Sequence, residues 1–396
     1  MAKTAGAPPA TPDGPAAPAA AHHRLGWRIR LEHALRPWRR ANRMARVLVV
    51  VGFLITSAFG IMAVFSDQIA PFAPAQYCLS DGYDEEFGRC TAGAEQVPRR
   101  VEPSPGHPFG TTSARFDVLS RVIHGASAAF QVVVFSTAFA MLIGVPLGLF
   151  SGYVGGRFDR VLVMFMDTVY ALPALLLALL IAFVVTAPPD PEAPMLVYWV
   201  QRLNTGVLGF IERLGVDRNY VPAAASVGVV YIPQYYRVIR NHTLAVKEEP
   251  YVEAARALGA KRRTIVFRYV FFNVVQSVPV LFTLNAADGV LTLAGLGFLG
   301  IGVTYPAAEW GVDVSRGISD AVAGFWWTAF WPGVAITTLV TGLTLMGEGL
   351  NDIVNPLLRI RGYKGRAPRR SKPTPELTAE LAEGAVARGA EGGSDR

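Results

Sequence analysis

Two cysteines, Cys78 and Cys90, are the side chains of this 396-residue chain best suited to covalent chemistry. Both lie in one stretch that follows the first long apolar segment of the chain. In an oxidising compartment a bridge between them would close a short loop and contribute about 3 kcal/mol in the chain-entropy model. We therefore predict a disulfide between Cys78 and Cys90.

Four carboxylates lie between these cysteines and raise the question of a metal site. Asp81, Asp84, Glu85 and Glu86 do not follow the spacing of a calcium-binding loop, so a solvated acidic loop is the favoured interpretation. HExxH and paired-cysteine patterns are also absent from the sequence. The sequence therefore predicts no metal site.

The sequence also lacks the phosphate-binding loop of nucleotide hydrolases. No GxxxxGK pattern followed by Ser or Thr occurs anywhere in the chain. We therefore expect no catalytic residue, no cofactor bound by this chain and no enzymatic activity of its own.

The amino-acid composition indicates the class of protein in which these residues lie. The chain is 52% hydrophobic and only 17% charged, which is more apolar than a soluble protein requires. Its net charge of +7 does not indicate nucleic-acid binding, because the basic residues alternate with apolar runs instead of gathering on one folded face. The composition indicates a membrane protein in contact with the lipid bilayer.

Six apolar segments are each close to the roughly 20 residues that a helix needs to cross a bilayer. They predict an all-α polytopic membrane protein with six transmembrane helices. Pro173 and Pro279 lie within two of the segments and predict kinks there. The segments are residues 47–66, 128–152, 161–186, 220–240, 273–297 and 329–350.

The distribution of basic residues predicts the orientation in the membrane. With the N-terminus inside, 28 of the 37 Lys and Arg residues fall in cytoplasmic segments. The positive-inside rule then places both termini in the cytoplasm of a multi-pass plasma-membrane protein. In this arrangement residues 67–127 form an external loop, and residues 187–219 form a second external insertion.

The two ends of the chain differ from the apolar middle. Residues 1–23 are mostly Ala, Pro and Gly, and we expect a disordered tail. Residues 24–46 carry eight arginines interleaved with apolar side chains, which fits an amphipathic segment at the cytoplasmic surface or a charge cluster that only sets topology. We expect residues 353–396 to be a cytoplasmic tail, disordered from about residue 361.

Between two of the apolar segments, residues 249–259 predict a short cytoplasmic helix within a loop over residues 241–269. Pro250 suits the first position of a helix, and Gly259 can adopt the positive φ that ends one. So short a helix requires packing to be stable. Tyr251, Ala254, Ala255 and Leu258 offer a small apolar face for that purpose, beside the polar Glu253.

The run Glu253-Ala254-Ala255 followed by Gly259 resembles the signature loop of ATP-binding-cassette importer permeases. The resemblance implies a helix that docks on an ATPase subunit and transmits its motion. Glu253, Ala254, Ala255, Leu258 and Gly259 are then the expected coupling residues.

Two further stretches are similar to the C-type permease of oligopeptide, dipeptide and nickel importers. One runs from His107 to Thr112 and continues with residues 117–121, and the other covers residues 296–302 and 309–311. Together with the loop above, these matches extend over roughly residues 103–358. Residues 128–352 are then the permease core.

This resemblance implies half of a translocation pathway for peptides, in the fold of type I importer permeases. The implied partners are a second homologous permease, two ATPase subunits that use ATP and Mg, and an external solute-binding protein. Nickel or another solute is the alternative substrate. A self-contained secondary transporter or channel is the alternative class, for which more ionisable residues within the spans would be expected.

Asp288 is the acidic side chain placed clearly inside a predicted span, with Asn285 one turn earlier. A charge at that depth is costly unless it faces a cavity or a partner. Asn285 and Asp288 are therefore candidates for lining the pathway, or alternatively for a structural hydrogen bond between helices.

Overall fold

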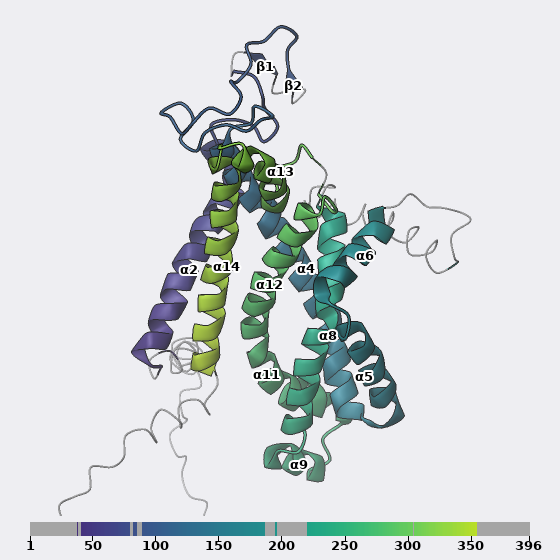
Figure 1. Ribbon diagram of the computed structural model, residues 1–396. Coiled ribbons are helices and arrows are strands. Elements are labelled where there is room, and N and C mark those ends of the chain that lie inside the picture. Colours follow the sequence, from purple (N-terminus) through teal and green to yellow (C-terminus); the bar gives the residue numbers. More distant parts are fainter. Residues whose placement is uncertain are drawn as a thin grey trace, which may run out of the picture.

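The structure is a computed structural model in which long helices stand side by side (Figure 1). The expected N-terminal tail lies outside the described residues, as do the insertion at 187–219 apart from the isolated Met195 and most of the basic segment 24–46. The expected tail 353–396 also lies outside them, except for residues 353 and 354, which belong to the last helix. The residues described are 38, 41–79, 82–84, 89–186, 195, 220–303 and 305–354.

Helices dominate the described residues, and several are long enough to cross a bilayer. Four helical stretches are long and apolar enough to cross a membrane, or five if α5 and α6 form one broken span. The all-α polytopic class is confirmed, whereas the predicted count of six is not reached, because α8 falls outside that set. The long helices are α2 (Arg43–Val64), α4 (Val118–Val154), α5 (Gly156–Tyr170), α6 (Ala174–Thr186), α8 (Val221–Val246), α12 (Val278–Phe298) and α14 (Trp327–Val354).

Shorter elements lie at the two ends of these helices. Figure 1 places the β-hairpin and α13 at one end of the molecule and α9 at the other. The hairpin is held by a disulfide between Cys78 and Cys90, and Tyr83 lies opposite Cys90 in its antiparallel pair. The short elements are α3 (Ser66–Ile69), β1 (Tyr83–Asp84), β2 (Arg89–Cys90), α9 (Pro250–Ala257), α10 (Arg262–Thr264), η2 (Ile265–Val270), α11 (Phe271–Val274), η3 (Val275–Ser277) and α13 (Trp310–Val322).

The prolines act differently from the prediction. The predicted span at 161–186 is not one kinked helix, because α5 ends before Pro173 and α6 continues at 93° to it. Pro279 likewise lies in the first turn of α12, where its missing N–H costs little. The prolines inside helices are instead Pro146 in α4, Pro233 in α8 and Pro332 in α14.

A stripe of glycines lets α4 and α8 pack closely along much of their length. A Cβ atom at Gly148 would lie 2.6 Å from the carbonyl oxygen of Tyr236, and one at Gly152 would lie 2.9 Å from that of Arg240. No larger residue fits such a separation, which is the usual reason for small residues between membrane helices. The spacing of these glycines therefore has a packing cause.

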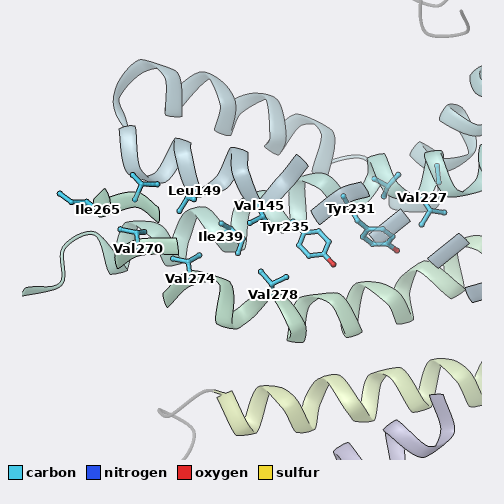
Figure 2. Packing of buried hydrophobic residues seen from close by; sticks show 14 of the residues in the cluster. Val145, Leu149, Val227, Tyr231, Tyr235, Ile239, Ile265, Val270, Val274 and Val278 are labelled. Atoms are coloured by element: carbon cyan, nitrogen blue, oxygen red, sulfur yellow. The ribbon is translucent and has the colours of Figure 1, made fainter. Parts of the chain in front are cut away.

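The main apolar core joins α4, α8 and the stretch from η2 to α12. Figure 2 shows side chains of the three stretches pointing toward one another, including Leu149 from α4, Ile239 from α8 and Val270 from η2. All three are at most 3% exposed. This core reaches the end of the molecule at which α9 lies, and it therefore decides how α9 is held.

Candidate functional site

The short helix α9 has the boundaries that the sequence predicts. Pro250 occupies its first turn, and Gly259 adopts a φ of 79° just beyond its end. The N–H of Ala260 donates to the carbonyl of Ala255, and the N–H of Gly259 donates to that of Arg256, both at 3.0 Å. These two bonds form a Schellman cap, which only a residue with positive φ completes at low cost.

One face of α9 packs on the core and the other is open. Val252 is fully buried and Ala255 is 7% exposed, whereas Leu258 is 88% exposed and Glu253 and Ala254 are also exposed. The expectation that Ala254 and Ala255 share a docking face is wrong for Ala255, because its position one helical turn from Val252 directs it inward. The open face includes Glu253, Ala254 and Leu258, and the predicted Tyr251 is exposed as well, at 42%.

The buried face of α9 joins it to the long helices. Val252 belongs to the same apolar cluster as Leu149 of α4, Ile239 of α8 and Ile265 at the start of η2. Close-packed side chains of this kind transmit displacement instead of absorbing it. A force on the open face of α9 would therefore move the ends of three helices together.

A polar clamp fixes the same end of the molecule. The guanidinium of Arg240 donates from Nε to Oδ1 and from Nη2 to Oδ2 of Asp159, each at 2.6 Å. Ser151 also donates to Asp159 and lies 2.8 Å from the hydroxyl of Tyr236. The clamp ties the turn between α4 and α5 to α8, the helix that leads into α9.

A cavity of about 580 Å³ lies where α5 and α6 break. Asp288 of α12 lines it and is exposed, and no hydrogen bond or ion pair to its carboxylate is found among the described residues. Tyr231 of α8 and Thr292 of α12 share a 2.9 Å hydrogen bond in its wall. The carboxylate thus faces open space, which disfavours the alternative of a hydrogen bond between helices.

Asn285, the second candidate, does not line this cavity. Its side chain is fully buried in the interior. Asn285 and Asp288 are three residues apart, which places them about 60° from each other around the helix. That offset is enough to turn Asn285 into the core while Asp288 faces the cavity, so Asp288 alone remains a pathway candidate.

The motifs around Arg121 and Glu309 assemble into a polar cap over the helix ends at the end of the molecule opposite α9 (Figure 1). Arg121 at the start of α4 forms an ion pair with Asp313 of α13 at 2.6 Å, and both side chains are buried. Arg121 also donates to the carbonyls of Pro74, Pro306 and Ala307. One guanidinium therefore joins four separate segments of the chain.

Glu309 caps α13 in the same region. It accepts hydrogen bonds from the backbone N–H groups of Gly311 and Val312 at 2.9 and 2.8 Å. Gly297 in α12 makes room for this carboxyl, since a Cβ there would collide with it. Burial raises the pKa of Glu309 to about 8, although the two N–H donors favour the charged form.

Several of these relationships are not visible in the sequence. The motif resemblance marks Arg121 and Glu309 but not their partners, because Asp313 is far away in the chain. The one signal for the Arg240–Asp159 clamp is that the two residues carry opposite charges and lie near the ends of their helices. Within the ranges that the structure describes, no three His, Cys, Asp or Glu side chains gather closely enough to hold a metal ion.

The helices, the break between α5 and α6 and the isolated helix α9 define a multi-pass transport protein. Residues 144–360 match the family described as binding-protein-dependent transport system inner membrane component. The chain belongs to this family. It is therefore a multi-pass inner-membrane permease subunit of a transport system.

Relatives of this chain are similar over most of their length. It is 27% identical to the dipeptide transport system permease protein DppC of Alkalihalophilus pseudofirmus, over 82% of this chain and 92% of the relative. It is 28% identical to the glutathione transport system permease protein GsiD of Pectobacterium atrosepticum, over 81% and 90%. It is 30% identical to the probable D,D-dipeptide transport system permease protein DdpC of Escherichia coli, over 65% and 76%.

Proposed function

We propose that this chain is a permease subunit of an ATP-binding-cassette importer for short peptides. The observation that carries the proposal is α9, a short helix whose buried face belongs to the same apolar cluster as residues of α4, α8 and η2, and whose open face is led by Leu258. The relatives named for dipeptide and glutathione transport support a peptide as the substrate. Nickel or another solute is the alternative cargo.

The proposed complex supplies what this chain lacks. A second homologous permease completes the pathway, two ATPase subunits bind ATP and Mg, and an external solute-binding protein delivers the peptide. Both termini lie in the cytoplasm, so α9 faces the ATPases and the disulfide-linked hairpin lies outside. In this arrangement Glu253, Ala254 and Leu258 contact an ATPase, while Gly259 fixes the end of the lever.

The mechanism follows from the packing of α9. ATP-driven closure of the ATPase subunits displaces α9, and the buried contact through Val252 passes this displacement to α4, α8 and η2. The cavity beside Asp288 then opens alternately to the two sides. A secondary transporter has no ATPase subunit, so a solitary coupling helix of this kind would not be expected in it.

Co-purification tests the proposal directly. Leu258→Asp places a charge on the open face of α9, and the control Val322→Asp does the same at an apolar residue of α13 that is 85% exposed. We expect the wild type and the control to retain tagged ATPase subunits when all subunits are expressed together, and Leu258→Asp to lose them. Ion-driven uptake by this chain alone, without an ATPase, would contradict the proposal.

A further inference from the structure

A second cavity, of about 870 Å³, lies beside α9 and belongs neither to the pathway nor to the open face of that helix. Its apolar part comes from Phe150 and Val154 at the end of α4 and from Phe267 of η2. The two rings meet edge to face at 6.2 Å, yet both side chains are more than 40% exposed, and Val154 is 66% exposed. An apolar wall is therefore open to whatever surrounds this end of the molecule.

The remaining side of the cavity is strongly basic. Arg256, Arg262 and Arg263 line it and are exposed. No ion pair of these arginines with a carboxylate is found among the described residues, in contrast to Arg237 and Arg240, which both have aspartate partners. Three positive charges thus share one cavity without neutralisation, and this favours an anionic ligand.

Further exposed apolar side chains follow the apolar wall in the chain. Phe158 and Val161, at the start of α5, are 54% and 62% exposed. A ligand that satisfies both parts of the cavity has a negative head and an apolar body. Basic pockets beside membrane helices are suited to phospholipid headgroups for this reason.

We infer that the cavity between the end of α4 and the α9–η2 connection binds an anionic phospholipid. Its phosphate lies among Arg256, Arg262 and Arg263, and its acyl chains lie along Phe150, Val154 and Phe267. The inference rests on the proposed cytoplasmic position of α9, which places the arginines at the headgroup level of the inner leaflet.

The lipid and the ATPase would occupy different surfaces of α9. Only Arg256 of this helix lines the cavity, whereas Glu253, Ala254 and Leu258 lie outside it. A bound lipid would therefore bridge α9 to the end of α4 while the open face stays free for docking. The anionic lipid content of the membrane would then tune how firmly the lever is attached.

Native mass spectrometry of the purified full-length chain tests this inference without any ATPase, so its outcome is separate from that of the coupling proposal. The probes are phosphatidylglycerol and phosphatidylcholine with matched acyl chains. We expect phosphatidylglycerol to be retained at least tenfold more strongly by the wild type, since each basic residue near a membrane surface contributes about fivefold in affinity. Equal retention of the two lipids would overturn the inference without recourse to any variant.

Two multiple variants, one inside the cavity and one outside it, locate the site. Arg256→Gln combined with Arg262→Gln and Arg263→Gln should abolish the preference for phosphatidylglycerol. Arg157→Gln combined with Arg160→Gln removes exposed charges from the same end of the molecule but outside the cavity, and should leave the preference unchanged. The inference would be overturned if the Arg157/Arg160 variant lost the preference and the triple variant kept it. Full displacement of the lipid by inorganic phosphate would also overturn it.

Discussion

Arg240 on α8 and Asp159 on α5 form an ion pair with two parallel hydrogen bonds of 2.6 Å. Both side chains are largely withdrawn from solvent, at 22% and 13% exposed. The pair links the start of α5, just after the turn that follows α4, to α8, the helix that leads into α9. It therefore holds these helix ends in place beside α9.

A double-mutant cycle measures the strength of this clamp. We expect Arg240→Ala and Asp159→Ala to show a coupling energy of about 1–3 kcal/mol in the unfolding of the purified protein, because charge-assisted two-bond pairs are strong. The matched pair Arg237–Asp167 is 44% and 53% exposed. It should couple by about 0–1 kcal/mol, as exposed ion pairs do, and equal coupling in both cycles would contradict the assigned role.

The Glu309 carboxyl gives a pH-dependent stability with a defined sign. Its folded-state pKa of about 8 lies above the ordinary value of 4.5. Between these values the folded protein holds a proton that the unfolded chain has released. This contribution is therefore fully favourable below about pH 4.5 and declines as the pH rises through about 8.

Glu309→Gln removes this titration, although its amide has one acceptor oxygen where the carboxyl has two, so one of the two backbone N–H groups loses its partner at every pH. The difference in stability between variant and wild type should shift in favour of the variant progressively between about pH 5 and pH 8. Thermal unfolding of the detergent-solubilised protein measures this shift. Asp313 and Arg121 also face this site, and both are retained in the variant; the exposed residue Glu348, changed to Gln, serves as a control that should track the wild type.

Asp288 should affect transport and leave assembly intact. Its unpaired carboxylate presents a negative charge in the cavity where α5 and α6 break, suited to the ammonium group of a peptide. Asp288→Asn keeps the shape and removes the charge, and we expect uptake to fall on the order of tenfold. Asp352→Asn, at an exposed position near the end of α14, is the control. Loss of the assembled complex in Asp288→Asn would instead indicate a structural role.

The disulfide between Cys78 and Cys90 is tested by thiol labelling of denatured protein. Denaturation is required because Cys78 is fully buried and a free thiol there would escape the reagent. The chain has only these two cysteines, so no other thiol contributes to the signal. We expect labelling only after reduction, and labelling of both cysteines in unreduced protein would exclude the bridge.

Local chemistry in the sequence was sufficient to place α9. Pro250 and Gly259 mark its ends because their backbone restrictions act at single residues. The side that Ala255 faces could not be derived in the same way, since it depends on which face of α9 the core covers. The α-helical spans follow from apolar length, which is also a local property.

Long-range relationships were beyond the sequence. Pro173 predicts a disturbance in its span, but the 93° angle between α5 and α6 depends on how α8 packs against both helices and α12 against α6. The same applies to Arg121 and Asp313, which meet only when α13 folds over the start of α4. Asp288 was singled out for its charge, whereas the burial of Asn285 depends on the rotation of α12 within the bundle.

The central claim is that α9 is the lever between ATP hydrolysis and transport, and Gly259→Val tests it most directly. The left-handed conformation of Gly259 would cost valine about 1–3 kcal/mol of backbone strain, and a Cβ there meets no other atom within 4 Å. Gly324→Val is the matched control, because Gly324 also has a positive φ and open surroundings but follows α13 at the opposite end.

The measurement is the amount of peptide taken up per ATP hydrolysed, in vesicles reconstituted with all subunits. We predict that both variants insert into the membrane normally. Gly259→Val should lower this ratio or lose the ATPase subunits, whereas Gly324→Val should keep both. Fully coupled uptake by Gly259→Val would contradict the account, because α9 would then have no role in coupling ATP hydrolysis to transport.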